Sequence, residues 1–389
     1  MRMLRNSVCG VVLLALFSAP VLAATKPSGP PVTIGAILSI TGPYAPLGEP
    51  ERNAIQIAVA DVNATGGING HPLAVQILDD ESKADTAQQL ATQLIGNKVA
   101  AIIGGSISPT SVAIARTAND AKVLQVYMTP TLSVWQTKDG INKYTFEATP
   151  HNELEVTKLF TFMKNTLHTK KLAVLHDDQL YGTQGTQVAE AESKAQNIPI
   201  VDEESYAVTA TDVTPQLQKV KAAGADTILI YTAAPSAGII VRQVHQFGMG
   251  AHLIGTTGIV SDNFLKVTGK DGDGVYADMD LDRTYPNAVQ KKLLNAYRAA
   301  YASSANSSAP GANNFASFAW DAVHLVAYAL RTAKSTDGDK LVAALESMKP
   351  YTGTTGTFKF TPTDHNGFNA QDIRIVIDHD GVWETLPKQ

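Results

Sequence analysis

Apolar and polar positions follow two different periods along this chain, and the two periods alternate regularly. Short runs rich in β-branched residues predict buried strands at 32–38, 73–80, 99–105, 122–128, 171–177, 225–232 and 251–257. Between them, apolar residues recur at helical spacing, which predicts helices at 49–63, 83–96, 109–121, 151–167, 181–197, 212–223 and 235–247. Strands that alternate with helices in this way indicate an α/β fold with parallel sheets.

This alternation changes in the last third of the chain. Three helices in succession are predicted at 286–303, 313–334 and 337–348. Strands are then predicted at 352–360 and at 372–386, the latter as a hairpin that turns at Asp-Gly. The length of 389 residues favours two domains, and each of the two strand–helix series has about the right size for one of them.

The first residues carry the pattern of a secretory signal peptide. Two arginines give a positive start, and the apolar run 8–17 is too short to span a bilayer. Small residues then mark a cleavage site after Ala23 or Ala24. We therefore predict a signal peptide over residues 1–23 and a mature protein in a periplasm.

Cysteine content and charge narrow the function further. Cys9 is the only cysteine, so the mature chain can form neither a disulfide nor a thiolate metal site. The nine histidines show no metal-binding spacing, and we expect no metal and no cofactor. A formal net charge of -5 argues against a nucleic-acid partner.

The stretch GGSISPTS (104–111) raises the question of what its loop binds. It lacks the lysine of a phosphate-binding loop and the glycine spacing of a dinucleotide fingerprint. Ser108 and Pro109 are favoured residues for a helix start, and the free N–H groups of Thr110 and Ser111 would favour an anion such as a carboxylate. The alternative is that Ser108 only caps the helix.

Several stretches together resemble the solute-binding proteins of the branched-chain amino acid ABC importers. The most specific is SITGPYAPLGEPERNAIQIAVADVNATGGINGHPL (39–73). The others are DDESKADTAQQLATQLI (79–95), IIGGSISPTSVAIA (102–115), HDDQLYGTQG (176–185), VRQVHQFGM (241–249) and FASFAWDAVHLVAYAL (315–330). The resemblance covers nearly the whole mature chain.

The resemblance implies a type I periplasmic binding protein with two lobes. Each lobe would be a doubly wound parallel sheet with flanking helices, and three crossovers would join the lobes. The N-terminal lobe would comprise 32–149 and 282–357, and the C-terminal lobe 150–281 and 358–389. The ligand would lie between the lobes at the carboxyl ends of the strands, where open α/β sheets favour binding.

The resemblance also implies which residues hold the ligand carboxylate. Ser108 matches the serine that binds it, and Thr110 lies at the same helix start. Thr129 and Thr131 match a small backbone donor and a threonine hydroxyl. For both threonines the alternative is an ordinary polar cap where a strand passes into a loop.

Further positions bear on the shape of the ligand. Tyr181 matches a tyrosine that closes over the ligand, although a surface or interlobe position is the alternative. Ala233 and Leu47 stand where aromatic residues are common in the family, which predicts a roomier pocket. Asp177 and Asp178 end a predicted strand, where solvated carboxylates are common, and we assign them no role.

Thr257 departs from the family pattern in charge. Members that bind amino acids carry an acid there, which pairs with the ligand ammonium. A buried ammonium without a counter-charge costs several kcal/mol. Either Asp262 or Asp280 therefore replaces the acid, or the ligand is an aromatic or aliphatic acid that lacks the amine.

We predict a non-enzymatic protein that captures a small carboxylate by lobe closure and passes it to the membrane permease subunits of an ABC importer. We expect it to be a monomer. The main alternative is a periplasmic ligand sensor of the same fold. An exported hydrolase would need an activated nucleophile, and the sequence contains no G-x-S-x-G motif.

Overall fold

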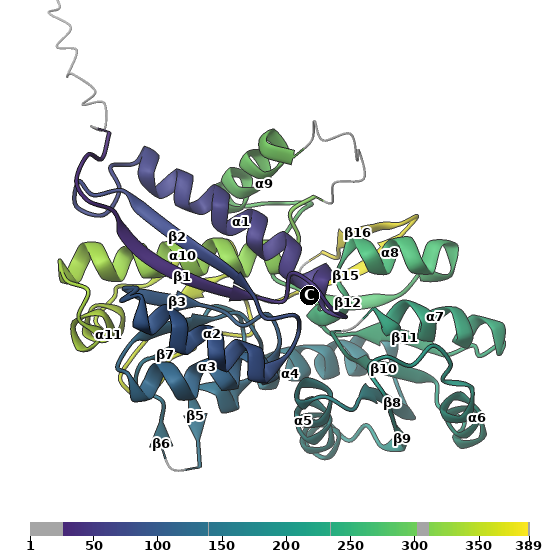
Figure 1. Cartoon of the computed structure of the whole chain (residues 1–389). Helices are drawn as coiled ribbons and strands as arrows, with labels where there is room; N and C mark the ends of the chain where they lie inside the picture. The colour runs from purple at the N-terminus through teal and green to yellow at the C-terminus, as the bar shows by residue number, and fades with distance from the viewer. Residues whose placement is uncertain (1–25, 139, 234, 302–310, 388–389) are drawn as a thin grey trace, which may run out of the picture.

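The computed structural model describes residues 26–387 apart from 139, 234 and 302–310. The chain folds into two α/β lobes that lie beside each other (Figure 1). The predicted signal peptide, 1–23, lies outside the described residues. Among the described helices, none is long and apolar enough to cross a membrane.

The first lobe is built on a five-stranded sheet in the order β2-β1-β3-β4-β7, with every neighbouring pair parallel. Its strands are β1 (Val32–Leu38), β2 (Leu73–Asp79), β3 (Ala101–Ile103), β4 (Leu124–Tyr127) and β7 (Thr145–Glu147). Its helices are α1 (Ala45–Ala64), α2 (Ala84–Gly96), α3 (Ser108–Asp120), α9 (Ala288–Tyr301), α10 (Asn314–Ala333) and α11 (Gly338–Glu346).

Helices cover both faces of this sheet because alternate strand residues point to opposite sides. Ile34 and Leu38 of β1 are buried in the cluster that contains α1, α10 and α11. Ile37 is buried in the cluster that contains α2 and α3. The first lobe is therefore doubly wound, as the alternating pattern predicts.

The second lobe is built on a seven-stranded sheet in the order β16-β15-β12-β11-β10-β8-β9. Its strands are β8 (Leu172–Asp177), β9 (Ile200–Tyr206), β10 (Thr227–Tyr231), β11 (His252–Gly255), β12 (Tyr276–Met279), β15 (Arg374–His379) and β16 (Val382–Thr385). Its helices are α4 (Asn152–Phe162), α5 (Leu180–Gln196), α6 (Thr214–Ala223), α7 (Ser236–Gln246) and α8 (Asp262–Thr268). The last two strands are antiparallel, so this sheet is mixed rather than purely parallel.

The order of strands and helices shows where the chain passes between the lobes. The first passage follows β7 and the second follows β12, because α9 and α10 pack on α1. Phe360 and His365, however, still pack on Phe146 of β7, with ring centroids 5.0 and 3.9 Å apart. We therefore place the third passage between His365 and Arg374, later than residue 357. The other lobe boundaries stay a prediction.

Some elements differ from the sequence pattern for local reasons. The predicted strand 99–105 ends at Ile103, because the backbone leaves the extended conformation at Gly104, where φ is 127°. This position requires glycine, since a Cβ there would lie 2.1 Å from the Ile37 carbonyl oxygen. The predicted strand 352–360 is instead a short antiparallel pair, β13 (Tyr351–Thr352) and β14 (Thr357–Phe358). A further small hairpin is formed by β5 (Gln136–Thr137) and β6 (Gly140–Ile141).

Candidate ligand-binding cleft

A cavity lies between the lobes at the carboxyl ends of the strands. The cavity is narrow in this structure, with a volume of about 30 Å³. The first lobe contributes Tyr44, Leu47, Ser106, Ile107, Ser108, Pro109, Met128, Thr129, Pro130, Phe315 and Phe318. The second lobe contributes Asp177, Tyr181, Ala233, Thr257 and Gly258.

Ser108 lines this cavity, but it does not cap its own helix. The residue before it, Ile107, is the N-cap, and the Ile107 carbonyl accepts the first helical bond from the Ser111 N–H at 2.9 Å. The Ser108 hydroxyl instead lies 2.6 Å from the Thr131 hydroxyl on the loop after β4. The capping alternative is therefore wrong, and of the two N–H groups expected to be free, that of Ser111 is already used.

The neighbouring threonines have separate places. Thr129 lines the cavity, and its hydroxyl donates to that of Ser111 at 3.1 Å. Thr131 and Thr110 are not among the lining residues. The Thr110 hydroxyl donates to the Ile107 carbonyl at 3.0 Å, so it stabilises the helix start, and Thr131 supports Ser108 from behind.

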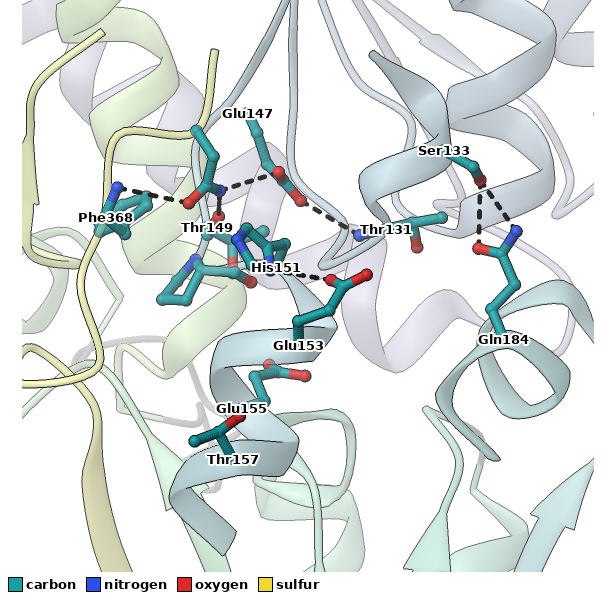
Figure 2. A network of polar contacts seen from close by, with 12 residues as sticks. Thr131, Ser133, Glu147, Thr149, His151, Glu153, Glu155, Thr157, Gln184 and Phe368 are labelled. Carbon is teal, nitrogen blue, oxygen red and sulfur yellow. Dashed lines mark hydrogen bonds and ion pairs between the residues drawn. The ribbon is translucent and has the colours of Figure 1, made fainter. Parts of the chain in front are cut away.

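The loop that carries Thr131 is held by a buried carboxyl group at the end of β7. Glu147 is fully buried, and it accepts hydrogen bonds from the Thr131 N–H at 3.1 Å and from Asn366 Nδ2 at 2.8 Å (Figure 2). Asn366 Nδ2 also donates to the Thr149 carbonyl at 2.6 Å. Burial raises the pKa of Glu147 well above its usual range. This group thus joins the cleft loop to the chain between the lobes.

Asp177 is the carboxylate in the cavity wall, which the sequence analysis missed. It ends β8, is 1% exposed and accepts the Gln179 N–H at 2.9 Å and the Thr232 hydroxyl. Burial raises its pKa, and those two bonds oppose the rise. The strand-end position is as predicted, but the expected solvation is wrong, because the side chain is buried and bonded to Gln179 and Thr232 of its own lobe.

Tyr181 lines the cavity from the first turn of α5. Its ring packs on that of Tyr231, with centroids 4.8 Å apart, and its hydroxyl donates to Glu155 at 3.3 Å. Burial, together with Asp278 and Asp280, raises the pKa of Glu155 well above its usual range. The ring of Tyr181 therefore faces the ligand space while its hydroxyl is tied to a buried acidic cluster.

Thr257 lies in the second-lobe wall, as expected, but its hydroxyl is engaged. It accepts a hydrogen bond from Asn314 Nδ2 of the first lobe. Neither acid proposed to replace the missing charge lines the cavity. Asp262 faces Arg283 at 3.8 Å, and Asp280 is buried behind the wall.

Ala233 and Leu47 also line the cavity, on facing lobes. The larger apolar surfaces come from Phe315 and Phe318 of α10, which no local pattern marked as part of a site. Their helix was predicted, but its contact with the cleft depends on a fold that brings residue 315 beside residue 47. No histidine, cysteine or acid cluster in the described parts of the chain is arranged to hold a metal ion.

Outside the cavity, one pair of side chains ties the lobes together. Ser133 of the first lobe donates to Gln184 Oε1 of α5 at 3.1 Å, and Gln184 Nε2 lies 3.0 Å from the same hydroxyl (Figure 2). Both residues are partly exposed, so the pair marks the rim where the two lobes meet.

A sequence profile for the family described as periplasmic binding protein matches residues 31–376, and the chain belongs to that family. Relatives of similar length are named for the binding of leucine, isoleucine and valine. The Leu/Ile/Val-binding protein homolog 3 of Brucella melitensis is 26% identical over 344 residues, which cover 88% of this chain and 90% of that protein.

Two solved structures share the fold across both lobes. The branched-chain amino acid transporter substrate binding protein LivJ from Streptococcus pneumoniae, in complex with isoleucine, has a TM-score of 0.80 at 24% identity and covers 91% of this chain and 99% of its own. A solute binding protein of an ABC transporter from Rhodopseudomonas palustris, in complex with 3,4-dihydroxy benzoic acid, has a TM-score of 0.79 at 24% identity, with coverages of 92% and 96%. The predicted fold class is confirmed, and fold and family are those of non-enzymatic solute-binding proteins.

Proposed function

We propose that this protein captures a small carboxylate between its lobes and delivers it to the membrane permease subunits of an ABC importer. The observation that carries the proposal is a cavity whose walls come from both lobes, with Ser108, Thr129 and the start of α3 on one side. Hydroxyl groups and the positive end of a helix dipole suit a carboxylate. Residues from the facing lobe then enclose it.

The ligand is an amino acid or, as we favour, an aromatic or aliphatic acid without the α-amine. The relatives named for leucine, isoleucine and valine support the first, and the neighbour that holds 3,4-dihydroxy benzoic acid supports the second. At Thr257 an α-ammonium group would meet a hydroxyl that already accepts a bond from Asn314, and no charge. Its desolvation would therefore be poorly compensated.

The two-lobed fold supports a role in transport. The mature protein would act in the periplasm as a monomer, and only the closed form would present a surface made of both lobes to the permease. Loss of ligand uptake in a strain that lacks the protein would support the importer role, whereas unchanged uptake would favour the sensor.

A ligand screen tests capture and closure together. A ligand at 100 times its Kd should stabilise the protein by about 2.7 kcal/mol, seen as a higher melting temperature, because it binds only the folded state. Small-angle scattering should show a smaller radius of gyration on binding and a monomeric mass. Calorimetry should find 4-methylvalerate bound more tightly than leucine. Tight binding with an unchanged radius would contradict closure, and a preference for leucine would contradict the ligand class.

A further inference from the structure

The loop that follows β4 carries two hydroxyl groups that act in different places. The Thr131 hydroxyl lies 2.6 Å from that of Ser108, which lines the cavity. Ser133, two residues later, bonds to Gln184 of the second lobe at the rim (Figure 2). The position of this one loop therefore affects both the cavity wall and the contact between the lobes.

The Thr131 hydroxyl has one useful orientation when a carboxylate is bound. A hydroxyl group carries a single donor, and a carboxylate only accepts. If Ser108 donates to the ligand, its oxygen can accept in turn from Thr131 at 2.6 Å. A shift of Thr131 would remove this donor and leave the Ser108 hydroxyl free to turn away from the ligand. The binding geometry of Ser108 thus depends on where the loop places Thr131.

Glu147, at the end of β7, holds this loop at both ends. Its Oε1 accepts a hydrogen bond at 3.1 Å from the Thr131 N–H, which is shared with the Thr129 carbonyl at 2.8 Å. Its Oε2 accepts a hydrogen bond from Trp135 Nε1 at 3.3 Å, beyond the turn Leu132–Val134. Glu147 is fully buried, and the low local dielectric strengthens these bonds.

Asn366 ties Glu147 to two of the passages between the lobes. Its Nδ2 donates to Glu147 Oε2 at 2.8 Å and to the Thr149 carbonyl at 2.6 Å. The Phe368 N–H donates to Asn366 Oδ1 at 3.3 Å, which fixes the orientation of the amide (Figure 2). The three groups that donate to Glu147 here are N–H groups. They suit its ionised form and oppose the rise in pKa that burial causes.

We propose that Glu147 is a positioning residue for carboxylate binding, which holds Thr131 beside Ser108 and fastens this loop to the chain between the lobes. The inference rests on the proposed function, because Ser108 must receive the carboxylate. Glu147 itself is not among the residues that line the cavity. Ligand affinity therefore depends on a side chain that the ligand does not touch.

Glu147→Gln tests the bond to Thr131 with a side chain of the same shape. Gln has one carbonyl oxygen, and the two donors at the Oε2 position favour it there. Its NH2 group then faces the Thr131 N–H, and two donors cannot bond. Calorimetry should show phenylacetate and leucine each bound about tenfold more weakly, because a hydrogen bond to a charged group is lost. Glu190→Gln removes the same charge from an exposed position of α5 and should change neither affinity.

A double-mutant cycle separates positioning from a general loss of structure. If Glu147 acts through Ser108, Glu147→Gln should cost about twofold or less in a protein that already carries Ser108→Ala. An equal loss in both backgrounds would assign Glu147 to structure alone. Thr131→Val removes only the supporting hydroxyl, so it tests the same link if Glu147→Gln fails to fold. It should weaken both ligands, and unchanged affinity would overturn the inference.

Hydrogen exchange on the ligand-free protein distinguishes this inference from the proposed function. The amides of 131–135 should exchange about tenfold faster in Glu147→Gln than in Glu190→Gln, because the loop opens more easily without its acceptor. Equal exchange would overturn the positioning role, whether or not a ligand binds. If exchange differed but neither acid bound the parent protein, the proposed function would fail and Glu147 would keep only its hold on the loop.

Discussion

The two walls of the cleft differ in the electrical character that they present to a ligand. The first-lobe wall offers the hydroxyls of Ser108 and Thr129 beside the start of α3. The second-lobe wall offers the Asp177 carboxylate and the Tyr181 ring. One wall carries hydroxyl groups and the other carries a buried carboxylate, so the two walls present different charges to a ligand.

The walls differ as much in what supports them. Behind the first, Glu51 accepts a hydrogen bond from Ser106. Behind the second lie Glu155, Asp278 and Asp280, and no side chain among the described residues donates to either aspartate. Burial raises the pKa of acids behind both walls, Glu51 and Glu147 as well as Asp278 and Asp280, so the walls differ in the side-chain hydrogen bonds that these acids accept and not in the protonation that they favour.

The largest effect is expected from Ser108→Ala in the first wall. Losing the hydroxyl should weaken every carboxylate ligand by about 1–3 kcal/mol, because the anion loses one donor. The melting temperature without ligand should change little, since Ser108 does not cap α3. Ser347→Ala, at an exposed serine after α11 that does not line the cavity, is the matched serine control in calorimetry. Unchanged affinity in Ser108→Ala would remove the anion-binding role from this wall.

A smaller effect, on stability, is expected from the acids behind the second wall. Burial raises the pKa of Asp278 from 3.8 to about 7. The folded protein thus keeps a proton that the unfolded chain releases, and its free energy of unfolding falls as the pH rises from about 4 to 7. Asp278→Asn should therefore be more stable than the parent by about 1–2 kcal/mol at pH 8, with a smaller gain at pH 5.

Melting curves across this pH range measure the difference. Asp120→Asn changes an exposed aspartate at the end of α3 and should show no such trend. A gain in Asp278→Asn that is equal at both pH values would mean that packing, and not titration, sets the cost of this acid.

The smallest effect is expected at the rim, where the walls meet. Gln184→Ala removes the bonds to Ser133 and should lower ligand affinity by about 0.5–1 kcal/mol, because the closed form loses a partly exposed hydrogen bond. The loss should be the same for every acid that binds. A loss that differed between acids would mean that Gln184 contributes to the choice of ligand.

The sequence predicted the elements better than their contacts. Periodicity found α3 and β4 because hydrophobic spacing is local, and the resemblance placed Ser108, Tyr181 and Thr257 in the same cavity. Edge strand β9 was missed because its Asp-Glu-Glu sequence is polar and half-exposed. Its side chains carry little of the apolar pattern on which the prediction rests.

Residues that act across the cleft were harder to predict. Asp177 was set aside because an acid at a strand end is usually solvated, whereas this one is buried and bonded to Gln179 and to Thr232 on another strand end. Helix capping stayed open as the alternative for Ser108, since nothing near it in the sequence shows that its hydroxyl meets Thr131. Each of these outcomes depends on contacts between segments that the chain pattern does not relate.

Asn314 limits how the ligand specificity of the cleft can evolve. Its amide donates to Thr257, while its Oδ1 accepts the Leu281 N–H at 3.1 Å in the second passage between the lobes. A mutation at Thr257 therefore alters the conformational equilibrium as well as the ligand contact. Leu47 and Ala233 carry hydrocarbon side chains without such ties. Substitutions at these two positions can change the shape of the pocket without breaking a hydrogen bond between the lobes. Specificity for new ligands can therefore evolve there without a change in how the lobes open.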